Sequence, residues 1–426
     1  MSEIVIIGGG AAGMMAAARL SVPGSRVHIF ERNEKLGKKL FITGKGRCNL
    51  TNACDRQELM DAMVSNGKFM FSSLAAFDNM AVMQYFEGMG LKLKTERGMR
   101  VFPVSDHSSD VIKVLENQLK KQKVCIHLNS RVKTLDIRDK KVCGVVLENG
   151  CTVPADYVIV ATGGMSYPVT GSSGDGLRFA KEQKIKVTDV TPSLVPMVTK
   201  EEYIPEMQGL SLKNVELKLL QKGKTVYKEF GEMLFTHFGV SGPLVLTASA
   251  RCGKRLSKGE MQAFIDLKPA LSLEQLDHRL IREFQENPKK QLATIMGSLL
   301  PSKMIDPFLG ALALDSRKTA CETSKGDRYA IAGLLKAFPF TVTGLRGFEE
   351  AIITKGGVSV REIDPKTMAC KQVEGLYFIG EVLDLDAVTG GFNLQIAWST
   401  AAAAAADIQE KCICEDTEQL RKITVK

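Results

Sequence analysis

The chain has 426 residues, 44% of them apolar and 25% charged, which is long enough for two or three domains with substantial cores. The formal net charge of +9 suggests a nucleic-acid partner, but the basic residues occur singly or in pairs such as Lys38-Lys39 and Lys289-Lys290. Without a run of about five like charges or interleaved aromatic residues, the pattern favours a solvated surface over a dedicated nucleic-acid face.

The composition also argues against a membrane protein and a metalloprotein. No apolar segment approaches the roughly 18 to 20 residues that cross a bilayer. Glu3 precedes the first apolar run, which argues against a signal peptide, so we expect a cytoplasmic protein with no membrane partner. The ten cysteines form no CxxC pair and no zinc-type cluster with histidine, so we expect reduced thiols and no metal site.

A glycine-rich turn follows the first apolar run. Residues 4–7 (Ile-Val-Ile-Ile) are typical of a strand buried on both faces of a parallel sheet, and Gly8-Gly9-Gly10-Ala11-Ala12-Gly13 comes next. Gly8 permits a tight turn, Gly10 lets the backbone approach a pyrophosphate, and Gly13 lets the next helix pack against the strand. That helix, from Ala11 to about Leu20, would direct its N-terminal amides at the phosphates.

An acidic residue follows the second apolar run, residues 27–30, at the spacing of a dinucleotide fold. Glu31 lies 18 residues after Gly13, where a carboxylate accepts hydrogen bonds from both ribose hydroxyls. A carboxylate there also repels a 2′-phosphate, so the site would not favour NADP. Strand, glycine turn, alanine-rich helix and acid together predict a dinucleotide site far better than a lone GxGxxG does.

Two later segments favour FAD over a nicotinamide nucleotide. Residues 157–164 form another buried strand that ends in Ala-Thr-Gly-Gly, a usual element beneath the adenosine half of FAD in flavoproteins. Near the end, Gly380-Glu381 places an acid that can bond the ribityl chain or, through water, the pyrophosphate. Gly390-Gly391 then opens a helix, Asn393 to about Asp407, whose N-terminus would stabilise negative charge on the reduced flavin pyrimidine.

A polar loop lies directly behind the ribose-binding acid. Residues 35–52 carry several cations and three glycines, so we expect this loop to wrap the pyrophosphate and reach the flavin. Arg47 and Asn49 would supply donors, whereas Cys48 lies near the flavin without a catalytic role. The predicted FAD-binding residues are Gly8, Gly10, Ala11, Ala12, Gly13, Glu31, Arg32, Lys38, Lys39, Gly46, Arg47, Cys48, Asn49, Val132, Ala161, Thr162, Gly163, Gly380, Glu381, Asp384, Gly391, Phe392, Asn393, Leu394 and Gln395.

An insertion separates the two halves of this predicted FAD domain. We expect two helices in residues 56–90, with Phe69, Phe71, Phe77 and Phe86 in the core, and a small β-meander from Val124 to Leu147 under the adenine. The alternation of strands and helices stops near residue 190; β-type runs follow to residue 268, and a helical pattern with Pro301 and Pro307 as breaks follows to residue 325. The predicted domains are residues 1–190 (FAD domain, first part), 191–270 (β-rich insertion), 271–328 (helical subdomain), 329–345 (return of the β-rich insertion) and 346–426 (FAD domain, second part).

Three motifs closely resemble a bacterial FAD-binding flavoprotein family that includes the bile-acid-inducible 3-dehydro-bile-acid reductases and the aminoacetone oxidases. They are residues 44–52 (GKGRCNLTN), residues 162–176 around Ser166, Pro168 and Asp175, and residues 235–243 (FTHFGVSGP). The likeness covers essentially the whole chain. It implies an α/β fold with a two-dinucleotide-binding-type, Rossmann-like FAD domain, an inserted β-barrel-like domain and a small helical domain, and it implies non-covalent FAD.

Few residues qualify as proton donors or acceptors for flavin chemistry. His237 lies in the third motif, and Tyr167 lies in the loop after the Ala-Thr-Gly-Gly strand, so these two are the catalytic candidates. The structural alternatives are that His237 is a turn residue bonded to a neighbouring carbonyl and that Tyr167 belongs to the pocket wall.

Three functions compete. The first is an NAD(P)H-dependent FAD reductase of an unsaturated carbonyl compound, such as a steroid or bile-acid-like enone. Because the chain holds one dinucleotide fingerprint, the nicotinamide nucleotide would be a transient electron donor beside the small-molecule substrate. The second is a flavin amine oxidase that releases hydrogen peroxide, and the third is a flavin-dependent RNA-modifying or nucleic-acid-associated protein.

Overall fold

The computed structural model describes residues 2–21 and 24–424, and the chain divides into two compact units. Unit 1 combines Met1–Pro192 with Ala351–Lys426, and unit 2 is the continuous segment Ser193–Glu350. Each unit has its own hydrophobic core, as expected when each buries its apolar side chains independently.

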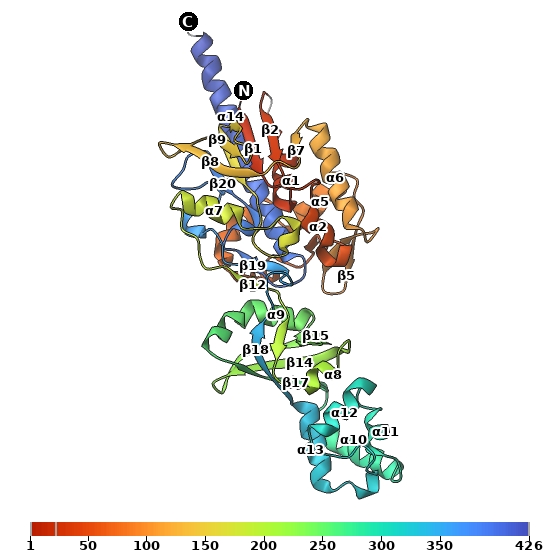
Figure 1. Cartoon of the computed structure of the whole chain (residues 1–426). Helices are drawn as coiled ribbons and strands as arrows, with labels where there is room; N and C mark the ends of the chain where they lie inside the picture. Colours follow the sequence, from red (N-terminus) through yellow and green to blue (C-terminus); the bar gives the residue numbers. More distant parts are fainter. Residues whose placement is uncertain (1, 22–23, 425–426) are drawn as a thin grey trace. The chain divides into compact units, whose positions relative to one another are not determined.

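A parallel five-stranded sheet forms the centre of unit 1 (Figure 1). Its strands, in spatial order, are β20 (Leu376–Phe378), β11 (Tyr157–Val160), β1 (Glu3–Ile7), β2 (Arg26–Phe30) and β7 (Cys125–His127). Ile4, Val5 and Ile6 are completely buried in β1, because the middle strand of this sheet is covered on both faces. The Rossmann-like fold class is therefore confirmed.

Two alanine-rich helices pack against each other in unit 1. They are α1 (Ala11–Arg19) and α14 (Phe392–Thr424). Residues 16–18 of α1 and 401–405 of α14 are buried alanines, and such small side chains allow two helix axes to approach closely. The helix expected to end near Asp407 instead continues to Thr424, since no glycine or proline interrupts it.

The remaining elements of unit 1 form short sheets and helices around this core. Four small sheets have the orders β10-β9-β8, β3-β6-β5, β21-β4 and β12-β19. Their strands are β3 (Thr51–Asn52), β4 (Met63–Ser65), β5 (Leu93–Glu96), β6 (Arg100–Pro103), β8 (Val132–Arg138), β9 (Lys141–Leu147), β10 (Thr152–Pro154), β12 (Thr191–Ser193), β19 (Ile353–Lys355) and β21 (Asp386–Ala387). The other helices are α2 (Lys38–Ile42), α3 (Arg56–Asp61), α4 (Phe71–Ala76), α5 (Asn79–Gly88), α6 (Ser108–Lys121) and α7 (Asp175–Glu182).

Unit 2 contains a closed six-stranded barrel and a group of helices. The barrel order is β13-β16-β15-β14-β17-β18, from β13 (Met197–Thr199), β14 (Ser211–Gln221), β15 (Lys224–Thr236), β16 (Gly239–Ser241), β17 (Met261–Asp266) and β18 (Phe338–Leu345). Met261, Ala263 and Ile265 alternate with more exposed residues and are fully buried, the period-two pattern of a strand with one face inside. The helices are α8 (Tyr203–Glu206), α9 (Pro243–Cys252), α10 (Leu273–Glu286), α11 (Leu292–Met296), α12 (Ser302–Gly310) and α13 (Lys325–Lys336).

The predicted meander was partly wrong. Its first strand, β7, joins the main sheet parallel to β2 instead of pairing with β8. The helix α6 separates β6 from β7, and a crossover helix is the usual way to return a chain to a parallel position in a sheet. The antiparallel sheet β10-β9-β8 begins only at Val132.

Two helical predictions were also wrong in detail. Residues 56–88 form three helices separated by β4 and a 3₁₀ turn, because Asn66 adopts a left-handed conformation and Asp78 caps a new helix through the amide of Ala81. Phe71 is 48% exposed, whereas Phe77 and Phe86 are buried as predicted. Pro301 precedes α12, but Pro307 lies inside it and removes one backbone donor.

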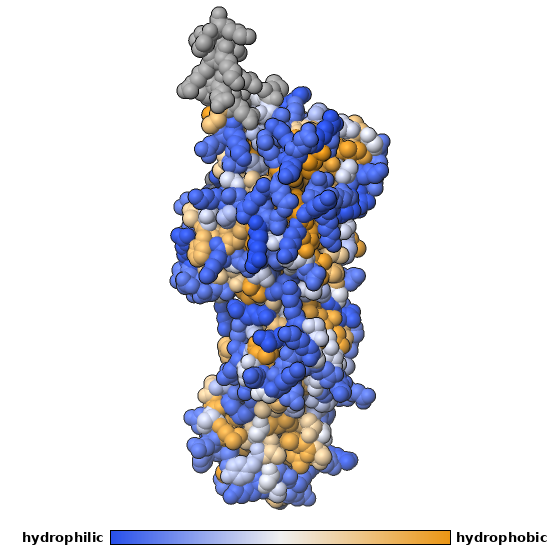
Figure 2. Space-filling view, turned by 90° about the vertical axis from the view of Figure 1, so that its left-hand side faces the viewer, coloured by the Kyte–Doolittle hydropathy of each residue, from blue (hydrophilic) through white to orange (hydrophobic). Residues whose placement is uncertain are grey.

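One face of the molecule shows the distribution of polar and apolar side chains. On the face that Figure 2 shows, hydrophilic side chains predominate and apolar areas are scattered among them. Within the described ranges, none of the helices is both long enough and apolar enough to span a bilayer.

Trp398 tests the core of unit 1. This fully buried side chain donates from Nε1 to the carbonyl of Leu50 at 2.9 Å and packs edge-on against Phe86. We expect Trp398→Ala to lower the free energy of unfolding by about 4 kcal/mol, because it leaves a large cavity. Trp398→Phe keeps most of the ring and should lower it by only about 1–2 kcal/mol, through the carbonyl left without its donor. Urea unfolding followed by circular dichroism measures both, and equal losses would contradict this packing.

Candidate active site

The turn between β1 and α1 forms an open cradle at the helix N-terminus. Gly8 has a φ of +104°, and a Cβ there would lie 2.6 Å from the carbonyl oxygen of Ala161. A Cβ at Gly13 would overlap the carbonyl oxygen of Gly8, so α1 touches the turn backbone to backbone. At Gly10, by contrast, a Cβ would have no atom of the described residues within 4 Å. The space next to the unpaired N-terminal amides of the helix is therefore open, which suits a pyrophosphate.

Glu31 is held at one side of this cradle by hydrogen bonds from the backbone. Its Oε2 accepts from the amide of Gly9 at 2.7 Å, and its Oε1 accepts from the amide and the side chain of Asn33 at 2.8 and 2.7 Å. The residue is 7% exposed. A carboxylate fixed in this way is positioned to accept from ribose hydroxyls with little loss of side-chain entropy.

Glu381 lies on the other side of the cradle from Glu31, and a second polar network forms around its carboxylate. It lies in the 3₁₀ turn Gly380–Val382, and Gly380 approaches Ala12 so closely that a Cβ would lie 2.8 Å from its methyl group. The Glu381 carboxylate accepts from Lys39 Nζ at 2.6 Å, from Ser166 Oγ at 2.7 Å and from the amide of Thr354 at 2.9 Å. Residues 39, 166, 354 and 381 are distant in sequence, and the contacts gather them at the start of α1.

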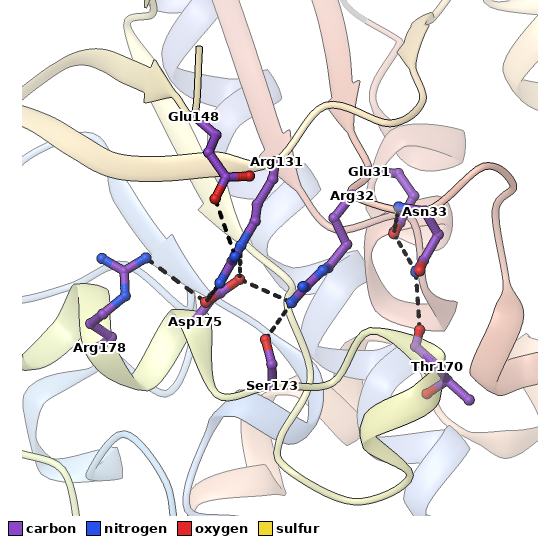
Figure 3. A network of polar contacts seen from close by, with 9 residues as sticks. All are labelled: Glu31, Arg32, Asn33, Arg131, Glu148, Thr170, Ser173, Asp175 and Arg178. Carbon is purple, nitrogen blue, oxygen red and sulfur yellow. Dashed lines mark hydrogen bonds and ion pairs between the residues drawn. The ribbon is translucent and has the colours of Figure 1, made fainter. Parts of the chain in front are cut away.

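A third network joins the segment after β2 to the start of α7 (Figure 3). Asp175 accepts two hydrogen bonds from Arg131, at 2.9 and 3.1 Å, and pairs with Arg32, which also bonds Ser173. Burial opposes ionisation of the Asp175 carboxyl, but hydrogen bonds and charge from Arg131, with Arg32 and Arg178, outweigh burial and hold its pKa below the usual range. The network thus fixes the segment that follows Glu31.

The N-terminus of α14 lies against β3. Gly391 has a φ of +98°, and a Cβ there would overlap the carbonyl oxygen of Thr51, so only glycine fits. The side chain of Asn52 donates to the carbonyl of Gly390 at 3.0 Å, and Thr51 Oγ1 donates to Gln395 at 2.6 Å. The backbone amides of the first turn of α14 are the groups left to face a ligand.

The predicted site residues all lie in unit 1, apart from His237. They fall on the β1–α1 turn (Gly8, Gly10, Ala11, Ala12, Gly13), after β2 and through α2 to residue 49 (Glu31, Arg32, Lys38, Lys39, Gly46, Arg47, Cys48, Asn49), at the start of β8 (Val132), after β11 (Ala161, Thr162, Gly163), in and after the turn 380–382 (Gly380, Glu381, Asp384) and at the start of α14 (Gly391, Phe392, Asn393, Leu394, Gln395). Contacts between Gly8 and Ala161 and between Lys39 and Glu381 connect four of these groups in two pairs.

Several of the predicted side chains already have partners within the protein. Arg47 pairs with Glu96 and Asp106, both at 2.5 Å, and lies over the ring of Phe102, so its guanidinium is committed within the protein. Gln395 and Asn393 are likewise used internally, Gln395 by Ser399 and Asn393 by the backbone of Ala387. The acids that pair with Arg47 are distant in the sequence, so sequence reasoning could not see them, whereas Ser399 lies one turn after Gln395 within α14.

Two of the predicted FAD-binding residues, Cys48 and Thr162, have buried polar atoms. Cys48 is fully buried, and burial raises the pKa of its thiol to about 12 despite a hydrogen bond with Thr43, so it stays a thiol. The hydroxyl oxygen of Thr162 is buried without a hydrogen-bond partner among the described residues. This oxygen lies against Gly176, where a Cβ would be 2.3 Å from it.

The two catalytic candidates lie in different units. Tyr167 is half-buried in unit 1 and has a φ of +51°, a strained conformation for a residue with a large side chain. His237 is exposed in the turn between β15 and β16 of unit 2, and its ring contacts Phe238 edge-on with centroids 4.9 Å apart.

Sequence reasoning missed a buried aspartate in unit 1. Asp386 is completely buried with Lys355 Nζ at 3.4 Å, and burial raises the pKa of its carboxyl although the charge of Lys355 opposes this. It therefore keeps its proton to a higher pH than an exposed aspartate does. The adjacent residue, Ala387, bonds Asn393 in the first turn of α14.

Comparison with known proteins identifies the family. A family model described as the HI0933-like protein Rossmann domain matches residues 2–407. The chain belongs to this family. A 3-dehydro-bile acid delta(4,6)-reductase from Clostridium scindens is 32% identical over 95% of this chain and 98% of its own length. Ribosomal RNA dihydrouridine synthases from Haemophilus influenzae and Escherichia coli are 32% and 31% identical over 96% and 95% of the chain, and over 99% and 98% of their own lengths.

Two solved structures share this fold. The 3-ketosteroid delta1-dehydrogenase from Sterolibacterium denitrificans aligns over 96% of this chain and all of its own with a TM-score of 0.53 and 14% identity. The FrdA subunit of E. coli quinol fumarate reductase aligns over 97% of this chain and 70% of its own with a TM-score of 0.50 and 14% identity. The predicted family resemblance is confirmed, and the chain is an FAD-dependent oxidoreductase of the HI0933-like family.

Gly10 allows FAD binding to be separated from folding. We expect Gly10→Val to fold with little loss of stability, because a Cβ at this position has no protein atom within 4 Å. It should purify with at least about tenfold less FAD, because the side chain fills the space beside the α1 amides. Flavin released on denaturation measures occupancy, and thermal unfolding of the flavin-free proteins measures stability. Gly13→Val is the matched control and should lower stability. A fully loaded Gly10→Val protein would contradict the assignment.

Asp175→Asn should show a pH-dependent loss of stability. The pKa of Asp175 is lower in the folded than in the unfolded chain, so its contribution is complete at neutral pH and is lost as pH falls below the ordinary value of 3.8. We expect the substitution to lower the free energy of unfolding by about 2 kcal/mol at pH 7 and by much less near pH 3. In Glu148→Gln, which removes the exposed end of the same network, the change should stay within about 0.5 kcal/mol. Urea unfolding at several pH values tests both variants.

Proposed function

We propose that this protein reduces a carbon–carbon double bond conjugated with a carbonyl group, with electrons that NAD(P)H delivers to FAD. One observation carries the proposal: the bile-acid reductase and the dihydrouridine synthases match the chain end to end at similar identity. Formation of dihydrouridine and reduction of a 3-oxo-Δ4,6 bile acid both add two hydrogens across a bond conjugated with a carbonyl. A shared site chemistry with different substrates accounts for both relatives.

The residues of unit 1 fit the needs of such a reaction. FAD, when bound and reduced, would supply the hydride. Glu31 and the α1 amides would hold its adenosine and pyrophosphate parts, and the first turn of α14 would favour negative charge at the pyrimidine edge. The one glycine fingerprint is assigned to FAD, so NAD(P)H would bind transiently and leave before the substrate enters.

A proton must reach the carbon next to the carbonyl group as hydride reaches the other alkene carbon. Tyr167 is our first candidate for the donor, because this half-buried phenol follows the Gly163-Gly164 turn in the chain and has a strained backbone conformation. His237 is the second, since it is exposed in a motif shared with the family.

Two classes of substrate remain, and each has support. The bile-acid reductase favours a steroid-like enone. The two dihydrouridine synthases, together with the net charge of +9, favour uridine in RNA. A flavin amine oxidase has no support among these relatives.

Anaerobic stopped-flow spectroscopy of the FAD-loaded protein tests the reaction. We expect NADH or NADPH to bleach the visible flavin absorbance, and a 3-oxo-Δ4,6 steroid or a uridine-containing ribosomal RNA to restore it. In Tyr167→Phe, bleaching by the nucleotide should be unchanged, whereas reoxidation by the substrate should slow by about 10²–10⁴. The rates of bleaching and of reoxidation are measured in His237→Gln in the same way. If neither nucleotide bleaches the flavin, or if a small amine bleaches it and air then yields stoichiometric peroxide, the proposal fails.

A further inference from the structure

A cluster of exposed cations lies on one part of the unit 2 barrel, which we call the basic face. It comprises Lys222, Lys224, Lys254, Arg255 and Lys258. The first two lie at the turn between β14 and β15, and the other three lie in the 3₁₀ helix η4 (Gly253–Lys258), which follows α9. These segments are about thirty residues apart in the sequence, so the five charges do not form a cluster along the chain.

Hydrogen bonds hold the two segments together. The side chain of Gln221, at the end of β14, donates from Nε2 to the carbonyls of Arg255 and Gly259, both at 2.9 Å. One amide group thus ties the β14–β15 turn to both ends of the loop that carries the other three cations. Leu256 of η4 packs against the barrel core and fixes the loop from beneath.

The charges of the basic face are not neutralised within the protein. Nearby cations outside it are paired, Lys228 with Glu216 and Arg251 with Glu229. Over the part of the chain whose side chains are described, no ion pair involves any of the five cations. Glu260 is the one acid in the segments 222–225 and 253–260. Five positive charges against one negative charge attract a polyanion more strongly than the average surface does.

The neighbours of these cations indicate which polyanion fits. The other residues exposed in the two segments are small or polar, namely Gly223, Thr225, Ser257 and Gly259. A membrane-binding surface would also present large apolar side chains, and a protein interface would be richer in aromatic residues. Lysine and arginine among small polar residues are typical of contacts with a nucleic-acid backbone.

We propose that the basic face binds the phosphate backbone of RNA. This inference deepens the proposed function, because it selects RNA over a steroid-like substrate. It departs from the expectation, drawn from the sequence, that the basic residues lie on a solvated surface and form no nucleic-acid face.

Fluorescence anisotropy with a short labelled single-stranded RNA tests the basic face in the full-length, FAD-loaded protein. The test variant is Lys222→Gln/Lys254→Gln/Lys258→Gln. The control is Lys289→Gln/Lys290→Gln/Lys325→Gln, which removes three exposed cations of the same unit outside the basic face. We expect the test variant to bind RNA at least about tenfold more weakly, and the slope of log K against log salt to become shallower by about 2. The control should change far less.

Three results would overturn the proposal. They are unchanged RNA affinity in the test variant, an equal loss in the control, and preferential binding of the wild-type protein to vesicles of anionic phospholipid. Flavin content and the rate of anaerobic bleaching by NAD(P)H are measured in the same samples and should be equal in all three proteins. Failure to bleach in every protein would count against the proposed reaction alone, because RNA binding is read without turnover.

Discussion

The architecture of unit 1 depends on one close approach of backbone to backbone. Gly13 in α1 touches the carbonyl of Gly8, and Gly8 in turn lies against the carbonyl of Ala161 after β11. A side chain at either glycine would push the helix away from the sheet. With these contacts made, the N-terminus of α1 faces open space at Gly10, and its alanines remain available to receive α14. Tight packing on one side of the turn therefore creates the empty cradle on the other.

The polar groups around this cradle are fixed by the protein itself. Glu31 and Glu381 each accept three hydrogen bonds, and Asp175 is held ionised by arginines against the penalty of burial. Such groups need little rearrangement when a charged cofactor binds, which is the condition for strong electrostatic interaction in a partly buried site. Arg47 is paired with two acids, so its side chain orders the loop and adds little net positive charge to the site.

The division of the chain separates the FAD domain from a second unit with a core of its own. Unit 1 is built around the glycine turn and its networks, which leave little freedom to change. Unit 2 has an independent core, so surface residues such as those of the basic face can vary without disturbing the FAD domain.

The sequence by itself determined the βαβ unit, the position of Glu31 and the Rossmann-like fold class, because glycine geometry and strand burial act over a few neighbouring residues. Only the tertiary structure decided the partners of Arg47, the joining of β7 to the main sheet and the Glu381–Lys39–Ser166 network. It also decided that cations scattered along the chain meet at the β14–β15 turn. Hydrogen bonds and ion pairs need atoms within a few ångströms, and which distant residues come that close depends on how the strands pair.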